Sequence, residues 1–329
     1  MDLKNQNINS EFLNNKKLSE YLLKNIKSKK LQNSIILYGD KGIGKATLIK
    51  KVIKNILNIN KEKSVIDLTN PNFYLLTPLY DDKKKQHKNN IIIDQIRLLD
   101  KNIKLTNLNI LPKFILIDSI DSLNLNASNA LLKILEEPPI NTYFFLISHQ
   151  LNKILPTIRS RCIKINIKNP DFNSFKNIVL SKNLGVSGDQ IIDLFYLTNS
   201  SPGLAIDFIN YDFDNIKNKI LDLFLNKELL NDDLINFSEI ITKNDNSYLL
   251  FIYIIKFILF NSLKNQYNIS EYKTLSFVNE IKDISTILSP KKIFHMLEYI
   301  NNNEENINKF NLDKKIFIIN FFSEILLNK

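Results

Sequence analysis

The sequence predicts an α/β domain built on a mainly parallel sheet, followed by an all-α half. Three observations predict this fold class. A glycine-rich loop stands between a short apolar run and a helical pattern, strands alternate with helices as far as residue 148, and helical periodicity dominates after Pro170. A chain of 329 residues is long enough for two or three domains.

The first half alternates between the two kinds of element. Apolar runs predict strands at 34–38, 72–78, 114–118 and 142–148, and apolar residues at helical spacing predict helices at 46–57, 90–103 and 127–137. Pro138 and Pro139 end the last of these helices. The charged stretch 79–90 is predicted to be a solvated loop. Strands that alternate with helices predict a parallel sheet covered on both faces.

The loop after the first strand, GDKGIGKATL at 39–48, almost fits the phosphate-binding pattern G-x-x-x-x-G-K-[ST]. The residues that match it are Gly39, Gly44 and Lys45, whereas Ala46 stands in the place of the hydroxyl and Thr47 follows it. Three of the chain's six glycines lie here, at Gly39, Gly42 and Gly44. Glycine is needed where the backbone turns tightly or approaches a ligand, so the loop predicts an anion cradle at a helix N-terminus.

The second half is read as helical nearly throughout. Its helices are interrupted at 185–188, at 202–203 and at Pro290, and the Asn-rich stretch 301–308 is predicted to be a loop. The predicted domains are an α/β domain at 1–168, a small helical domain at 169–209 and a larger helical bundle at 210–329.

Charge is divided unequally between the halves. The formal net charge is +10, but residues 1–168 carry +14 and residues 169–329 carry −4. Lysine excess is also what an AT-rich genome would supply, since the chain has only three arginines. A surface that binds nucleic acid, if there is one, is therefore expected in the first half.

Composition excludes several classes of protein. A single cysteine rules out an internal disulfide and a cysteine-rich zinc site. No run of eighteen apolar residues is found and the N-terminus is polar, so neither a transmembrane helix nor a secretory signal is expected. A cytoplasmic protein is the expectation.

The strand FILID at 114–118 ends in an acid, Asp118, at the distance from the phosphate loop where a magnesium-holding carboxylate is found. The alternative is that this aspartate caps a helix or turn. Ser119 stands next to it, where nucleotide-hydrolysing P-loop proteins usually have a glutamate.

Two further motifs narrow the field. LNASNALLKILEEPP at 125–139 and LPTIRSRC at 155–162, taken with the loop, resemble the bacterial clamp-loader branch of the AAA+ proteins, in a form similar to that of alphaproteobacteria. The resemblance covers the second half only through its helical character and the fragment NSSPGLA at 199–205. It implies an AAA+ P-loop domain, a helical lid and a C-terminal collar that joins related subunits.

The resemblance also implies roles for particular residues. Arg161, with Ser160 and Cys162, would be an arginine finger that reaches the nucleotide of a neighbouring subunit, and Ser148 would lie beside the γ-phosphate. Only an always-charged, forked guanidinium suits that position, and two of the three arginines, Arg159 and Arg161, fall in this motif. The alternative is a pair of surface salt bridges.

Three positions depart from an active ATPase. Ala46 lacks the metal-binding hydroxyl, Ser119 replaces the usual base, and Leu204 stands where the family has a second sensing arginine. We therefore expect ATP turnover to be lost, while ATP or ADP could still bind. The residues of that nucleotide site are Gly39, Gly42, Gly44, Lys45, Thr47, Asp118 and Ser148. No metal site is predicted, and the zinc module of related subunits is missing.

The expected function is that of a stationary subunit in the clamp loader of DNA polymerase III. Its expected partners are gamma- or tau-type motor subunits, a delta-type subunit, the sliding clamp and primer-template DNA, with no membrane. Three alternatives stay open: an active motor subunit of the gamma or tau type, another P-loop NTPase that works alone, and a free-standing DNA-binding protein.

Overall fold

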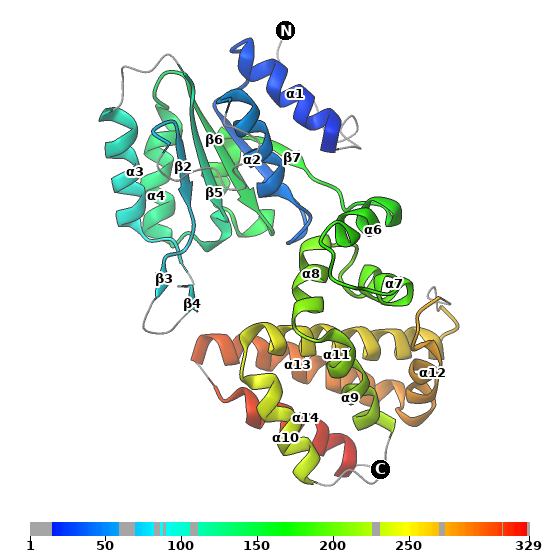
Figure 1. The fold of residues 1–329 in the computed structure, drawn as a ribbon. Helices are drawn as coiled ribbons and strands as arrows, with labels where there is room; N and C mark the ends of the chain where they lie inside the picture. The colour runs from blue at the N-terminus through cyan, green and yellow to red at the C-terminus, as the bar shows by residue number, and fades with distance from the viewer. Residues whose placement is uncertain are drawn as a thin grey trace. The chain divides into compact units, whose positions relative to one another are not determined.

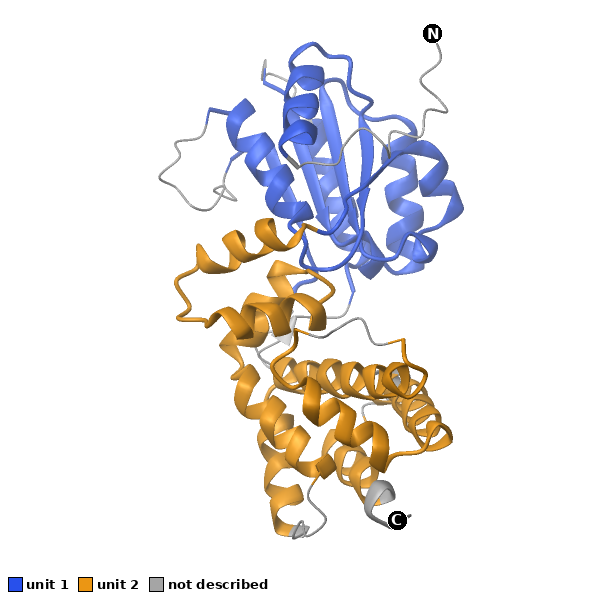
Figure 2. Cartoon of the chain, turned by 90° about the vertical axis from the view of Figure 1, so that its right-hand side faces the viewer, with its two compact units in different colours: residues 1–169 blue, residues 170–329 orange. Residues whose placement is uncertain are grey.

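The computed structural model describes residues 15–58, 70–81, 86–87, 90–105, 111–225, 231–269, 274–310 and 312–327. The chain divides into two compact units, residues 1–169 and residues 170–329 (Figure 2). The first unit holds the sheet, and the named elements of the second unit are all helices among its described residues.

The first unit is a five-stranded parallel sheet in the order β2-β5-β6-β1-β7 (Figure 1). Its strands are β1 (Ser34–Tyr38), β2 (Phe73–Leu76), β5 (Lys113–Asp118), β6 (Thr142–Ser148) and β7 (Ile163–Asn166). The pairing aligns Tyr38 with Ser148 and Asp118 with Ile147, so β1, β5 and β6 end within one residue of one another. This common edge is where the predicted nucleotide residues meet.

Helices cover both faces of the sheet, as the alternating pattern predicted. Leu18 and Leu22 of α1 (Asn15–Lys27) and Val52 of α2 (Lys45–Ile56) pack on one face of the sheet. On the other face lie α3 (Ile93–Leu105), α4 (Leu125–Glu136) and α5 (Pro156–Arg161), through residues that include Leu99 and Leu131. Alternate residues of each central strand enter the two cores, for example Leu116 and Ile117 of β5. Burial on both faces explains why the central strands are continuous apolar runs.

Short elements complete the first unit. The 3₁₀ turns η3 (Ile120–Ser122) and η4 (Leu151–Lys153) follow β5 and β6. A two-residue antiparallel pair, β3 (Tyr80–Asp81) with β4 (Gln86–His87), falls within the predicted loop 79–90, of which residues 82–85 and 88–89 lie outside the described residues.

The second unit contains α6 to α14. Their bounds are α6 (Phe172–Leu180), α7 (Gly188–Leu197), α8 (Pro202–Asn210), α9 (Phe213–Leu225), α10 (Asn231–Thr242), α11 (Asp245–Gln266), α12 (Val278–Ile287), α13 (Pro290–Phe310) and α14 (Lys314–Leu327). One hydrophobic cluster runs through the unit from Phe175 to Phe322. It crosses the predicted division between 209 and 210, and that division stays a prediction.

The predicted loop at 301–308 is wrong, because these residues continue α13. The asparagines suggested a loop, but the helical spacing of buried apolar residues runs on through them. Ile293, Met296, Ile300 and Ile307 lie on one face of the helix and are at most 4% exposed. Burial of this stripe outweighs the weak helix propensity of asparagine.

Among the helices that the structure describes, α11 alone is long and apolar enough by composition to cross a membrane. In the structure 56% of its apolar window is buried, and α11 packs against α9, α10, α12 and α13. This position at the centre of the unit accounts for its composition, since a helix surrounded by others is apolar all round.

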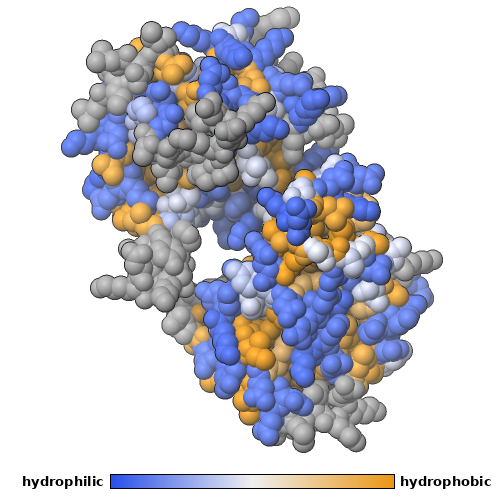
Figure 3. Space-filling model, viewed as in Figure 1, coloured by the Kyte–Doolittle hydropathy of each residue, from blue (hydrophilic) through white to orange (hydrophobic). Residues whose placement is uncertain are grey.

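The surface of the second unit also carries apolar side chains. Phe260, Phe294 and Ile316 are each more than half exposed. Figure 3 shows apolar patches among largely hydrophilic surface on the face drawn there.

Candidate functional site

The phosphate loop, residues 39–45, has the backbone that its glycines predict. Gly39, Gly42 and Gly44 have φ values of 144°, 83° and 91°. Residues that carry a Cβ rarely adopt such values. Gly44 is the N-cap of α2. A Cβ on Gly39 would lie 2.4 Å from the carbonyl oxygen of Ile167, so the backbone after β7 leaves no room there.

Lys45 turns back onto its own loop. Its residue is 3% exposed, and Nζ donates hydrogen bonds to the carbonyl oxygens of Gly39 at 2.7 Å and Asp40 at 2.6 Å. Burial lowers the pKa of Lys45 to about 8, against the opposing effect of Asp118, Asp121 and Asp40. The ammonium group that would meet a phosphate is thus bonded to the loop itself.

Asp121 organises the other side of this edge, and sequence reasoning missed it. Its carboxylate accepts hydrogen bonds from Ser148 Oγ at 2.8 Å and from the backbone N–H of His149 at 2.6 Å. Asp118 ends β5, three residues before Asp121. The repeated acid after the strand was the available signal, but its partners lie 27 and 28 residues further along the chain. The sheet edge therefore brings together Lys45, Asp118, Asp121 and Ser148.

His149 lies at the same edge. Burial lowers the pKa of its imidazole, and Lys45 and Lys41 add to this effect while Asp121 and Asp118 oppose it. Within the described part of the chain, its Nδ1 is a buried atom with no hydrogen-bond partner. Burial is the largest of these effects, and it disfavours the charged form of the imidazole.

The positions that depart from the ATPase pattern have ordinary structural surroundings. Ala46 packs against the core on the α1–α2 face, and Thr47 is exposed. The carbonyl oxygen of Ser119 accepts a hydrogen bond from Ser122 Oγ at 2.6 Å, within the turn η3. Leu204 is a buried residue of α8 in the second unit.

The arginine motif, residues 155–162, forms α5 and the turn into β7. Arg161 ends the helix, and its side chain is 37% exposed. Its Nη2 lies 2.5 Å from Glu136 Oε1, and its Nη1 donates to the carbonyl oxygen of Thr157 at 2.9 Å. Two contacts from different elements therefore hold a guanidinium that solvent still reaches.

The neighbours of Arg161 differ from it. Ser160 is exposed, and its Oγ donates to the carbonyl oxygen of Thr157 at 3.0 Å. Cys162 is buried, and burial raises the pKa of its thiol to about 12. Arg159 Nε is buried without a hydrogen-bond partner among the described residues. Of this motif, Arg161 is the residue whose charged head is both held and accessible.

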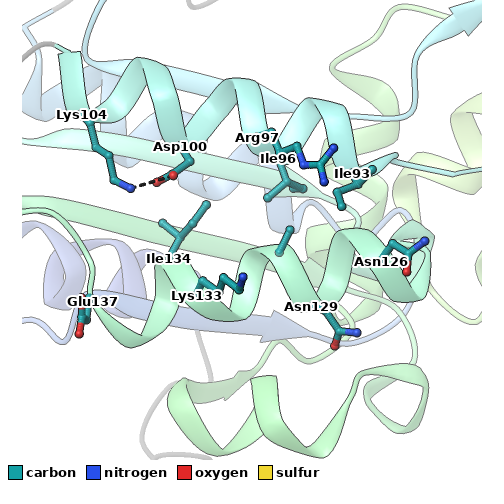
Figure 4. A pocket seen from close by; sticks show the side chains of 11 residues that line it. Ile93, Ile96, Arg97, Asp100, Lys104, Asn126, Asn129, Lys133, Ile134 and Glu137 are labelled. Carbon is teal, nitrogen blue, oxygen red and sulfur yellow. Dashed lines mark hydrogen bonds and ion pairs between the residues drawn. The ribbon is translucent and has the colours of Figure 1, made fainter.

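A groove of about 470 Å³ lies between α3 and α4 (Figure 4). Arg97, Asp100 and Lys104 come from α3, whereas Lys133 comes from α4 and Glu137 follows it. Asp100 and Lys104 pair with each other at 2.8 Å. None of the predicted site residues lines this groove. The described residues contain no group of three His, Cys, Asp or Glu side chains that could hold a metal ion.

Fold and site together define the class. A glycine loop between β1 and α2, a parallel sheet in the order β2-β5-β6-β1-β7 and an acid at the end of β5 are those of a P-loop α/β unit. Helices on both faces of the sheet and a helical second unit complete the predicted architecture.

Comparison with known proteins shows which family this chain resembles. Residues 14–171 match the family model described as "DNA polymerase III, delta subunit". DNA polymerase III subunit delta' of Pseudomonas aeruginosa is 34% identical over 143 residues, which are 40% of this chain and 42% of the relative. The subunit of the same name from Escherichia coli is 30% identical over 148 residues, which are 44% of this chain and 41% of the relative. The chain is thus similar to the delta-prime subunits of bacterial DNA polymerase III, as its motifs indicated.

A solved structure matches over a greater length. A DNA polymerase III gamma subunit-related protein from Thermotoga maritima has a TM-score of 0.51 at 16% identity, covering 94% of this chain and 98% of its own. This likeness concerns the fold alone. The sequence matches to the Pseudomonas and Escherichia relatives span less than half of their length. The likeness to alphaproteobacterial forms stays a prediction.

Proposed function

We propose that the chain is a stationary, non-motor subunit of the bacterial clamp loader, which places the sliding clamp on primed DNA. Its chemical contribution would be Arg161, acting as an arginine finger on ATP held by a neighbouring subunit. The observation that carries the proposal is the held but accessible guanidinium at the end of α5, 37% exposed, in a motif that resembles that of clamp-loader subunits. A guanidinium forks onto phosphate oxygens and keeps its charge at any physiological pH.

The chain's own loop supports the non-motor part of the proposal. Ala46 offers no hydroxyl to Mg²⁺, and Ser119 offers no carboxylate to activate water. Leu204, in the place of the sensing arginine, is buried and apolar. Each of these groups normally lowers the barrier to phosphoryl transfer, so their joint loss would remove turnover.

Nucleotide binding is a separate property, and the glycine backbone of the loop fits a phosphate group. Gly39, Gly42, Gly44 and Lys45 would hold the phosphates, with Thr47, Asp118 and Ser148 around them. Lys45 would have to exchange its two carbonyl partners for phosphate oxygens. ATP or ADP would then be a structural ligand that is not turned over, bound weakly because the loop already satisfies its lysine.

The remaining parts of the proposal concern the assembly. Residues 1–168 would meet the sliding clamp and the primer-template DNA, which suits their net charge of +14. Residues 169–209 would form the lid, and residues 210–329 would join a collar with gamma- or tau-type and delta-type subunits. Exposed Phe260, Phe294 and Ile316 suit such a protein contact. The protein would work in the cytoplasm.

A motor subunit of the gamma or tau type is the second candidate, favoured by the sequence similarity to the DNA polymerase III gamma subunit of Buchnera aphidicola, which is 28% identical over 201 residues. It requires that the chain hydrolyse ATP by itself at ordinary AAA+ rates. ATP hydrolysis by the purified chain, measured with Mg²⁺, separates the two candidates. Negligible turnover is expected for the stationary subunit.

The direct test of the finger is reconstitution with motor and delta-type subunits. ATP hydrolysis stimulated by clamp and primed DNA is measured with the unchanged chain and with Arg161→Ala. We expect a fall of about ten-fold or more with the assembly intact, since arginine fingers supply about 10³–10⁵ in rate at related sites. An unchanged rate would refute the proposal.

A further inference from the structure

Arg161 does not stand alone at the surface, because an acid from another helix holds it. Glu136 Oε1 lies 2.5 Å from Arg161 Nη2, although the two residues are 25 positions apart in the chain. The carbonyl oxygen of Thr157, one helical turn before Arg161, accepts a hydrogen bond from Arg161 Nη1. We infer that Glu136 is a positioning residue, which fixes the guanidinium of Arg161 in the orientation presented to a neighbour's nucleotide. This inference rests on the proposed function.

The place of Glu136 is fixed by its helix. Glu136 is the last residue of α4, which begins at an Asn124 cap and is buried against the sheet through Ala127, Leu131 and Leu135. Pro138 and Pro139 end the helix directly afterwards. The carboxylate therefore projects from a rigid support at a defined point, as positioning requires.

The pairing leaves the guanidinium able to act. A guanidinium has five N–H donors, and the contacts with Glu136 and Thr157 engage one terminal nitrogen each. Other N–H groups remain for phosphate oxygens. Since the Arg161 and Glu136 side chains are 37% and 48% exposed, water screens the pair and its attraction is modest. Glu136 therefore orients Arg161 without withdrawing it.

A long, flexible side chain gains most from such a contact. Arginine has many rotamers, and all but one are lost when the side chain binds a phosphate in the transition state. A partner that holds the guanidinium beforehand reduces this entropic loss, which raises kcat and leaves nucleotide binding by the neighbour unchanged.

The experiment uses the reconstituted clamp loader and substitutes Glu136→Gln. Glu137→Gln is the matched control, because Glu137 is the next residue, is exposed, and lines the α3–α4 groove. We expect Glu136→Gln to lower kcat about three- to five-fold with the KM for ATP and the assembly unchanged, and Glu137→Gln to leave both values unchanged. Thermal unfolding of each variant checks that the fold is kept.

A double-mutant cycle separates positioning from a general structural effect. In the Arg161→Ala background, Glu136→Gln is expected to have no additional effect. If Glu136→Gln is fully active while Arg161→Ala is impaired, the positioning role alone is overturned. The same holds if the losses of the two variants add in the double variant, or if Glu136→Gln raises kcat. Full activity of Arg161→Ala would overturn the proposed function and this inference together.

Discussion

The phosphate loop and the arginine motif are both built around a cation, but they direct it differently. In the loop, Lys45 is 3% exposed and donates to two carbonyl oxygens of residues 39 and 40. In the arginine motif, the side chain of Arg161 is 37% exposed and pairs with an acid that is itself 48% exposed. One cation stabilises its own backbone, whereas the other is held where a second molecule can reach it.

This difference separates a fold-maintaining role from a functional one. Both motifs look functional when the sequence alone is considered, because both match patterns of nucleotide chemistry. Under the proposed function, the loop serves mainly to shape the first unit, and the arginine motif serves a partner. The following predictions test this contrast, from the largest expected effect to the smallest.

The sharpest contrast lies within the arginine motif itself, between Arg161 and Cys162. Burial raises the pKa of the Cys162 thiol to about 12 from 9.0, so the thiolate is about 1,000-fold scarcer at pH 8 than in an ordinary cysteine. We expect alkylation by iodoacetamide to be slowed at least that much in the folded chain. Labelling at the rate of the urea-unfolded chain would contradict the claim that only the guanidinium is presented.

The structural role of the loop is tested at its first glycine. Gly39→Ala would place a Cβ 2.4 Å from the Ile167 carbonyl oxygen, at a φ of 144°, so the backbone must shift. We expect a loss of about 2–4 kcal/mol in the free energy of unfolding, measured with urea.

Gly44→Ala provides the control for this prediction. Gly44 also has a positive φ, of 91°, but no atom lies within 4 Å of the position that a Cβ would take there. Its expected cost is about 1 kcal/mol. Equal effects of the two substitutions would show that the contact between the loop and the backbone at Ile167 contributes nothing.

Asp121 links the sheet edge behind the loop to the turn after β6. Asp121→Asn keeps the size of the side chain but replaces one acceptor oxygen with an NH₂ donor, which cannot accept from Ser148 or His149. We expect a loss of about 1–2 kcal/mol. Asp94→Asn, at a side chain that is 73% exposed, should cost less than about 0.5 kcal/mol. Similar values for the two would contradict the organising role of Asp121.

The burial of Lys45 predicts a dependence on pH. Its pKa is lowered from 10.5 to about 8 in the folded chain, so between these values the unfolded chain binds more protons. Stability contributed by Lys45 should therefore rise with pH through that window. The difference in unfolding free energy between the unchanged chain and Lys45→Met is expected to change by about 1 kcal/mol in favour of the unchanged chain from pH 8 to pH 9. A flat difference would show that the ammonium is not desolvated.

Much of the first unit could be predicted because its signals are local. The strands at 34–38, 114–118 and 142–148 are apolar runs buried on both faces, and the structure confirms them. Strand β7 was missed, since it is a four-residue edge strand in which only Ile165 is buried. The helix α1 was missed too, although Leu18, Leu22 and Ile26 repeat every four residues.

Contacts between distant residues set the limit of prediction at the site. The motifs indicated Lys45, Asp118 and Arg161, but no sequence pattern showed that Lys45 bonds to its own loop. The pairing of Glu136 with Arg161 and of Asp121 with Ser148 joins residues 25 and 27 positions apart. Such pairs depend on how the ends of strands and helices align in the folded unit, which the sequence does not state. The loop predicted at 301–308 failed for the opposite reason, because local composition was given more weight than helical spacing.

The central claim is that Arg161, and not the chain's own phosphate loop, serves ATP turnover. Its most direct test compares Arg161→Ala with Lys45→Ala in the reconstituted clamp loader, measuring hydrolysis stimulated by clamp and DNA at equal assembly. The account predicts a fall of about ten-fold or more for Arg161→Ala and a change of less than about two-fold for Lys45→Ala. The reverse order, with Lys45→Ala impaired and Arg161→Ala active, would contradict it.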